Sequence, residues 1–326
     1  MIKKILLFVL LIASGSLYAQ VLIKNASEAI SATKTITNDP AALNFIAMGD
    51  WGRNGADHQK QVAKQMGLTA TAVKAQFIIS TGDNFYPSGV ISAQDPSFKY
   101  SFEDIYTDFS LQWDWYVILG NHDYKSNPDA QVAYSKISRR WKMPARYFAK
   151  KFPINGDLEN QVLVAFIDTN PLIPEFYKNA EYGPNVKGQD TTAQKRWLSK
   201  TLADQDPAIK WKIVVGHHPM YTAGSRTDGY DTKAIRSTLK PVLDKYGVDV
   251  YLTGHEHSLQ YIKPEGKTHH FITGAASEKT PVKLIPDAQM VASEYGFMLF
   301  SVNKNELRVQ VINDEGYAVY NTVIKK

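Results

Sequence analysis

Short apolar runs that alternate with amphipathic stretches are the feature that most constrains how this chain folds. Runs of this length predict buried strands, and the stretches between them carry apolar residues at helical spacing. At about 57–74, for example, Val62, Met66, Ala70 and Val73 share one helix face. Helices are also expected at about 130–142, 191–204 and 231–246, and strands at 44–48, 77–81, 116–119, 162–167, 213–215 and 250–253.

Beyond residue 258 strand-like runs follow one another without intervening helices. They lie at 259–263, 269–273, 296–303, 306–312 and 317–324. A chain that begins with alternating strands and helices and ends in antiparallel strands fits two packed, mixed β-sheets flanked by helices. The predicted fold class is therefore α/β (α+β). The lack of an internal repeat or a low-complexity linker favours a single domain over residues 41–326.

The first twenty residues differ in composition from the rest. Lys3 and Lys4 precede an apolar run at 5–13 and small residues at 14–16, which is the order of a cleaved secretory signal. A membrane anchor is the alternative, but it needs an apolar run of roughly 20 residues. We therefore expect a signal peptide at 1–19 and a lead-in segment at 20–40. The protein is then exported, periplasmic or secreted, with no membrane attachment after cleavage.

Charge and cysteine content narrow the functional classes. The net charge is +5 over 326 residues, and basic residues occur singly or in short pairs such as Arg139-Arg140. A nucleic-acid surface needs a concentrated basic stripe, so nucleic acid is not an expected partner. Because the chain has no cysteine, an exported protein of this size must be stabilised by core packing and metal ligation. Nothing in the sequence fixes the oligomeric state, and a monomer is the simplest expectation.

Five segments combine a strand end, a glycine and potential metal ligands. In open α/β sheets the carboxyl ends of strands form the crevice where ligands bind, and glycine lets the chain turn sharply there. Taken singly, each segment is also compatible with an ordinary turn. Together they provide a ligand set for two metal ions: Gly49-Asp50-Trp51-Gly52, Gly82-Asp83-Asn84-Phe85-Tyr86, Gly120-Asn121-His122-Asp123, Gly216-His217-His218-Pro219 and Gly254-His255-Glu256-His257.

In order and spacing these segments resemble the calcineurin-like metallophosphoesterases, over about 44–260. Tyr86 stands where the small, animal-type purple acid phosphatases of that superfamily have an iron-binding tyrosine. Phenolate and carboxylates are hard ligands suited to a trivalent ion, whereas imidazoles suit divalent ions. The resemblance implies a ferric ion held by Asp50, Tyr86 and His257, a bridge at Asp83, and a divalent ion (Fe²⁺, Zn²⁺ or Mn²⁺) held by Asn121, His217 and His255.

The resemblance also implies an activity, the hydrolysis of small phosphate monoesters in acid. Two metal ions would provide a hydroxide nucleophile and hold the phosphoryl oxygens. His122 resembles the substrate-binding histidine of the family, which orients phosphate or protonates the leaving oxygen. The alternative for His122 is a supporting residue paired with Asp123. Alternative functions are a phosphodiesterase or nucleotide phosphohydrolase with the same metals, and a non-catalytic protein that binds metal or phosphate.

Two positions depart from the family pattern. Glu256 stands where related enzymes commonly have Asp, and because this residue is not a ligand there, replacement by Asp is expected to have little effect. Arg226 stands where a second phosphate-contacting histidine is usual. An arginine binds phosphate but is a poor proton donor, so we predict that Arg226 binds phosphoryl oxygens. The alternative is an exposed loop arginine beside Asp228.

Overall fold

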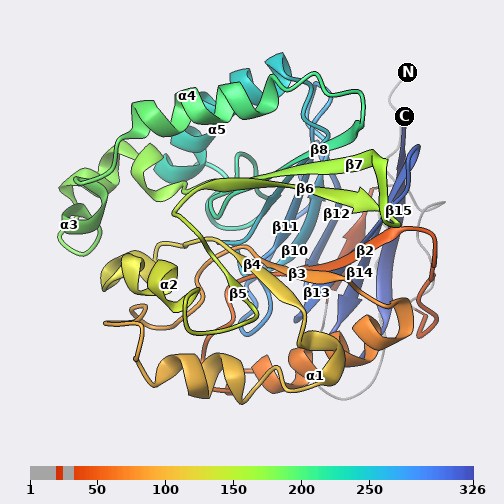
Figure 1. Cartoon of the computed structure of the whole chain (residues 1–326), viewed down its shortest axis with the longest axis horizontal. Coiled ribbons are helices and arrows are strands. Elements are labelled where there is room, and N and C mark those ends of the chain that lie inside the picture. The colour runs from red at the N-terminus through yellow and green to blue at the C-terminus, as the bar shows by residue number, and fades with distance from the viewer. Residues whose placement is uncertain (1–19, 25–32) are drawn as a thin grey trace.

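The computed structural model describes residues 20–24 and 33–326, which form two mixed β-sheets packed face to face with helices on their outer faces (Figure 1). One sheet has the order β1-β12-β10-β11-β9-β8-β7-β6, and the other has the order β15-β14-β13-β2-β3-β4-β5. This architecture confirms the predicted fold class. The predicted signal peptide at 1–19 and residues 25–32 of the predicted lead-in lie outside the described residues.

The elements have the following bounds. The first sheet contains β1 Gln20–Ile23, β6 Phe148–Ile154, β7 Asp157–Phe166, β8 Ile209–Val215, β9 Val250–Thr253, β10 Leu259–Ile262, β11 His269–Thr273 and β12 Ala288–Ser293. The second contains β2 Leu43–Met48, β3 Phe77–Ser80, β4 Asp114–Val117, β5 Trp141–Lys142, β13 Gly296–Val302, β14 Glu306–Asn313 and β15 Ala318–Lys325. The helices are α1 Gln59–Val73, α2 Pro128–Tyr134, α3 Gly183–Val186, α4 Thr191–Leu202 and α5 Tyr230–Lys245, with short helical turns at 98–103, 109–111, 123–125, 170–172 and 174–178.

Central strands are buried on both faces. In β2, Phe45 packs into the layer between the sheets, whereas Ile46 packs into the layer beneath the helices, and both side chains are fully buried. Val62 and Met66 of α1 meet Ile46 in that outer layer. The residues predicted for one face of this helix are therefore the ones that cover the sheet, as helical periodicity requires.

The parallel strands bring the five glycine-led segments to one side of the molecule. β2, β3 and β4 are parallel neighbours in one sheet, and β7, β8 and β9 are parallel neighbours in the other. Carboxyl ends of parallel strands lie at the same sheet edge, where open α/β sheets bind their ligands. The segments that begin at Gly49, Gly82, Gly120, Gly216 and Gly254 each follow such an end within a few residues.

The helix predicted at 130–142 is wrong in its second half. α2 ends at Tyr134, and Trp141 instead belongs to β5, where it pairs with Trp115 of β4. The cause is tertiary packing. The Trp141 ring lies against Trp51 and Phe102 in the core, while the buried Arg140 forms an ion pair with Glu103 at 2.8 Å. The prediction also omitted β1, β6 and β12. β1 lies in the predicted lead-in and pairs with β12.

Candidate metal centre

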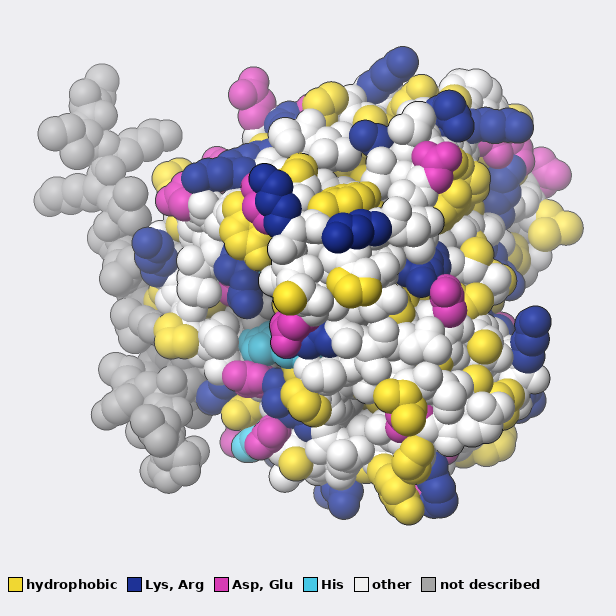
Figure 2. All heavy atoms as spheres, turned by 90° about the vertical axis from the view of Figure 1, so that its left-hand side faces the viewer, with side chains coloured by type: hydrophobic (Ala, Val, Ile, Leu, Met, Phe, Trp, Pro, Cys, Tyr) yellow, Lys and Arg dark blue, Asp and Glu magenta, His cyan; other side chains and the backbone are white. Residues whose placement is uncertain are grey.

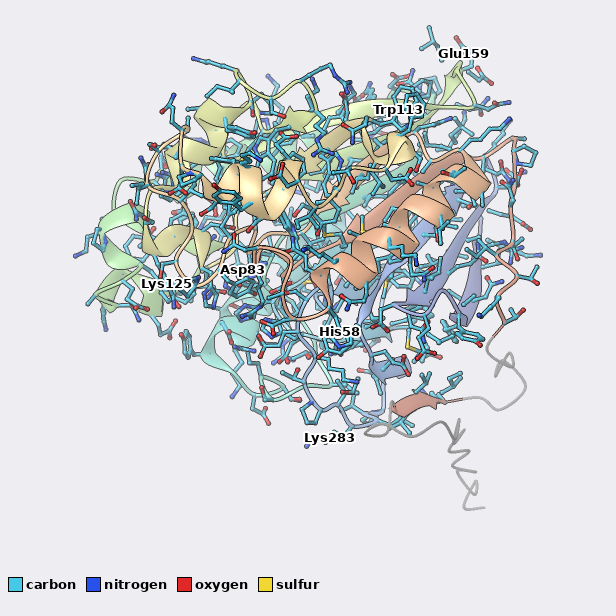
Figure 3. The ribbon with its side chains drawn as sticks, turned by 90° about the horizontal axis from the view of Figure 1, so that it is seen from below. His58, Asp83, Trp113, Lys125, Glu159 and Lys283 are labelled. Carbon is cyan, nitrogen blue, oxygen red and sulfur yellow. The ribbon has the colours of Figure 1, made fainter. Side chains whose placement is uncertain are left out.

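The backbone at the strand ends is held in an unusual conformation that aims acidic and imidazole side chains inward. Asp50, Asp83 and His255 have φ angles of 60°, 50° and 71°, in the left-handed region. Such angles cost a non-glycine residue about 1–3 kcal/mol and are concentrated at functional sites. The backbone of Gly120 packs so closely against Asp83 that no larger residue fits at this position, because a Cβ there would lie 2.1 Å from Oδ1 of Asp83. Asp83 itself lies well inside the molecule and is 1% exposed (Figure 3).

One half of the site, which we call the tyrosine group, contains Asp50, Asp83, Tyr86 and His257. The Tyr86 hydroxyl oxygen lies 3.2 Å from Oδ1 of Asp50 and 3.1 Å from Oδ2 of Asp83. It also lies 3.2 Å from Nε2 of His257. A hydroxyl has one proton to donate, so it can satisfy only one of the two carboxylate oxygens. A metal cation in this position would attract both carboxylates, the phenolate oxygen and the imidazole nitrogen.

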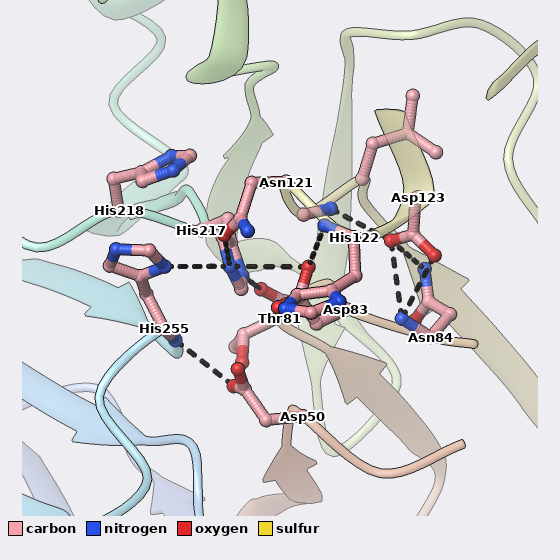
Figure 4. A network of polar contacts seen from close by, with 12 residues as sticks. Asp50, Thr81, Asp83, Asn84, Asn121, His122, Asp123, His217, His218 and His255 are labelled. Atoms are coloured by element: carbon pink, nitrogen blue, oxygen red, sulfur yellow. Dashed lines mark hydrogen bonds and ion pairs between the residues drawn. The ribbon is translucent and has the colours of Figure 1, made fainter. Parts of the chain in front are cut away.

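The other half, which we call the histidine group, contains Asp83, Asn121, His217 and His255, whose side chains point toward one another (Figure 4). Nδ1 of His217 lies 2.8 Å from the Thr81 carbonyl oxygen and must donate to it. Nε2 of His255 lies 2.8 Å from the Asp231 carboxylate. The remaining nitrogens, Nε2 of His217 and Nδ1 of His255, face each other at 3.2 Å. Asn121 Oδ1 lies 3.2 Å from the same His217 nitrogen.

Asp83 connects the two groups, because Oδ2 faces Tyr86 and Oδ1 lies 3.5 Å from Nε2 of His217. Ligand atoms of Asp50, Asp83 and His217 all lie within 4.8 Å of one another. The donor chemistry therefore fits metal ions in both halves. Buried carboxylate, phenol, amide and imidazole atoms, all of them common metal ligands, converge there from the ends of several strands. All seven residues predicted as ligands are brought together at this place.

The convergence of these charged groups also determines the pKa values of the side chains. Burial opposes ionisation of Asp83, but His217 above all, with His122 and His255, holds the pKa of this carboxyl well below its usual range. Burial likewise opposes protonation of His217, yet Asp83 and Asp50 raise its pKa to about 9. Burial, Asp50 and Asp83 raise the pKa of Tyr86 well above its usual range. A phenolate at this position therefore needs a cation beside it.

Several supporting residues carried no sequence signal. Asp231, at the start of α5, accepts from His255, and a carboxylate behind a histidine ligand fixes its ring orientation. Glu278 lies 3.3 Å from Nδ1 of His257 and fixes the orientation of that ring in the same way. The Asn121 amide nitrogen donates to the Tyr182 hydroxyl at 3.3 Å, which turns its oxygen inward. Asp123, by contrast, belongs to one of the five glycine-led segments; it accepts from the backbone N–H groups of Asn84 and Gly120, and so ties two of these segments together.

His122 lies at the edge of the tyrosine group. Its backbone N–H donates to Oδ1 of Asp83 at 2.8 Å, and its ring lies 4.4 Å from that of Tyr86. Nδ1 lies 2.6 Å from the carbonyl oxygen of Pro87 and donates to it. The His122 ring therefore pairs with this carbonyl, whereas the alternative interpretation required a pairing with Asp123. Nε2 is left without a bond to the described residues.

Arg226 lies beside the histidine group, with its side chain 42% exposed. Its Nε is 3.8 Å from Asp231, and its Nη1 is 3.9 Å from Glu256. Its backbone N–H donates to Oε1 of Glu256 at 2.9 Å. Asp228, named as its partner in the alternative interpretation, instead forms an ion pair with Lys233 at 3.9 Å.

The site reaches the surface at a recess. Figure 2, which looks onto the left-hand side of Figure 1, shows histidine there among acidic and basic side chains. His218 remains beneath the surface, with its ring 4.4 Å from that of His255 and Nδ1 2.8 Å from the Thr169 hydroxyl. Its Nε2 has no partner among the described residues. His217, His218 and His255 form a second possible metal-holding cluster.

Comparison with known proteins places these observations in a family. Residues 43–259 match the calcineurin-like phosphoesterase family. The chain is 38% identical to purple acid phosphatase 17 of Arabidopsis thaliana over 73% of its own length and 69% of the relative's. It is 34% identical to the tartrate-resistant acid phosphatase type 5 of Homo sapiens over 86% and 90%. The fold is also similar to that of GAP50, the anchor in the inner membrane complex of Plasmodium. That similarity has a TM-score of 0.73, with 22% identity and coverage of 87% and 89%.

Proposed function

The chain belongs to the calcineurin-like phosphoesterase family, and we propose that it is an exported acid phosphatase that hydrolyses phosphate monoesters at a centre of one ferric and one divalent ion. The observation that carries this proposal is the position of the Tyr86 hydroxyl, within 3.2 Å of Asp50, Asp83 and His257. A phenolate with two carboxylates is a hard, anionic donor set that favours a trivalent ion.

The histidine group suits the second ion. Two imidazole nitrogens and a neutral amide oxygen, with one oxygen of Asp83, favour Fe²⁺, Zn²⁺ or Mn²⁺. When bound, the two ions would supply a nucleophile from water and positive charge for the phosphoryl oxygens. Relatives named purple acid phosphatase and tartrate-resistant acid phosphatase support the choice of monoesters and of acid conditions.

Two side chains of the protein would act on the substrate itself. His122 is fixed by its bonds to Asp83 and Pro87, so its Nε2 can hold a proton for the leaving oxygen. Arg226 lies 3.8 Å and 3.9 Å from its two carboxylate neighbours, too far for close ion pairs. Its guanidinium donors therefore remain available for the oxygens of a phosphoryl dianion.

Export rests on the amino-terminal sequence. The order of basic, apolar and small residues at 1–19 is that of a cleaved secretory signal. Among the described residues, no helix combines the length and the apolar character that crossing a membrane requires.

Metal analysis and an absorption spectrum of the purified protein, with activity assays at pH 5, test the proposal. We expect iron and a second metal, a visible band from phenolate-to-iron charge transfer, and faster hydrolysis of p-nitrophenyl phosphate than of bis(p-nitrophenyl) phosphate. Tyr86→Phe should abolish the band. Tyr182→Phe, which removes a neighbouring hydroxyl outside the tyrosine group, should retain it. An iron-free, colourless and fully active wild type would refute the ferric assignment. Faster diester hydrolysis would favour a phosphodiesterase, and no turnover by the metal-loaded protein would favour a binding protein.

A further inference from the structure

Two charged residues outside the proposed ligand set contact the tyrosine group from its outer side. The guanidinium carbon of Arg53 lies over the Tyr86 ring, 4.0 Å from its centroid. Nη2 of Arg53 forms an ion pair with Glu278, and the same carboxylate oxygen lies 3.3 Å from Nδ1 of His257. Arg53 and Glu278 thus contact two proposed ligands of the same ion, although they lie 225 residues apart in sequence.

Further bonds hold Arg53 in this place. Its Nε donates to the Ser277 hydroxyl at 3.1 Å, and that hydroxyl donates to the Asp50 carbonyl oxygen at 2.6 Å. Its backbone N–H donates to the Gln59 side chain at 3.1 Å. The side chain is 22% exposed, compared with 44% for Glu278. An arginine held by bonds at both its backbone and its guanidinium is a fixed charge, unlike a solvated surface arginine.

We propose that Arg53, held by Glu278 and Ser277, is a positioning residue that fixes the Tyr86 ring and sets the electronic properties of the ion bound there. This inference rests on the proposed function, because it assumes a ferric ion bound to Tyr86. The guanidinium lies over the ring, whereas the ion would bind at the hydroxyl oxygen. Its positive charge therefore stabilises electrons on the phenolate more than electrons on the metal.

The direction of two measurable effects follows. Removing the charge raises the energy of the phenolate electrons, so the charge-transfer band moves to longer wavelength. Removing a positive charge near the ion also favours its oxidised state, so the ferric reduction potential falls. An arginine that only filled space would produce neither effect when replaced by an uncharged side chain of similar length.

The test compares iron-loaded full-length variants by visible spectroscopy and redox titration. Arg53→Met should move the band to longer wavelength and lower the potential, whereas Arg53→Lys should move both less. Arg53→Gln provides the same measurement if Arg53→Met fails to bind iron. Arg236→Met is the matched control, because Arg236 lies over the ring of Tyr221, 5.0 Å from its centroid and outside the tyrosine group. It should leave both values unchanged. In a Glu278→Gln background, the shift caused by Arg53→Met should be smaller.

The outcomes separate this inference from the proposed function. A wild-type protein without iron or without the band refutes the ferric assignment itself. A wild-type band that Arg53→Met and Arg53→Gln leave at the same wavelength, with an unchanged potential, overturns the role of Arg53 while the proposed function stands. A change confined to the Michaelis constant for the monoester would also overturn it, since Arg53 would then act on the substrate.

Discussion

Replacing Glu256 with Asp tests whether the length of this side chain, and not its charge, holds Arg226 in the site. Glu256 is fully buried between His255 and His257, and its Oε1 accepts the Arg226 N–H at 2.9 Å. The other carboxylate oxygen of Glu256, Oε2, packs tightly against Gly224, because a Cβ on Gly224 would lie 2.2 Å from it. Asp keeps the charge but shortens the side chain by one carbon–carbon bond, about 1.5 Å. At that separation the hydrogen bond is lost.

The loss of this bond should be visible in substrate binding. A hydrogen bond of this kind contributes about 1 kcal/mol. If it holds Arg226 against the phosphoryl group, the Michaelis constant for p-nitrophenyl phosphate should rise about fivefold. The turnover number and the content of both metals should remain close to wild type, because Glu256 lies in neither the tyrosine group nor the histidine group.

Steady-state kinetics and metal analysis of two variants decide the matter. Glu256→Gln keeps the length and one acceptor oxygen, so its Michaelis constant should stay closer to wild type than that of Glu256→Asp. Identical kinetics for Glu256→Asp and wild type would refute the reasoning and restore the expectation drawn from the sequence alone. A larger rise in the Michaelis constant for Glu256→Gln than for Glu256→Asp would mean that charge at this position matters and length does not.

Three further predictions concern other residues. Because Asp83 faces both groups, Asp83→Asn should lower the content of both metals together with turnover; loss of turnover with full metal content would contradict the bridge. Arg226→Ala should raise the Michaelis constant for a monoester about tenfold, more than for a diester, with the limbs of the pH–rate profile unmoved; kinetics equal to those of the wild type on both substrates would exclude Arg226 from the site. His270 is fully buried, and burial lowers its pKa to about 3. The pKa of histidine in the unfolded chain is about 6.5. Below that pH only the unfolded state gains a proton at His270, so the free energy of unfolding should fall by about 1.4 kcal/mol per pH unit. His270→Gln should therefore flatten the acid side of the stability curve, and an unchanged slope in chemical denaturation would contradict this.

The residues of the candidate site could be selected from the sequence because their signal is local. An apolar run followed by glycine and then Asp, Asn or His identifies a strand end whose next side chain turns inward. The five segments therefore indicated all seven proposed ligands. The same holds for α1, α4 and α5, whose apolar spacing is sufficient to predict a helix within one or two residues of its bounds.

The tertiary structure decided what each of these residues contacts. Asp231 behind His255, Glu278 behind His257, and Arg53 over Tyr86 are pairs whose members lie 21 or more residues apart. No local pattern marks such residues, because their proximity depends on which strand ends and loops meet. The helix predicted at 130–142 failed for the same reason. Helical spacing continues past Tyr134, but burying Trp141 among aromatic rings and pairing Arg140 with Glu103 outweigh that local preference. Sequence periodicity determined which side chains face inward, and long-range packing determined what they meet there.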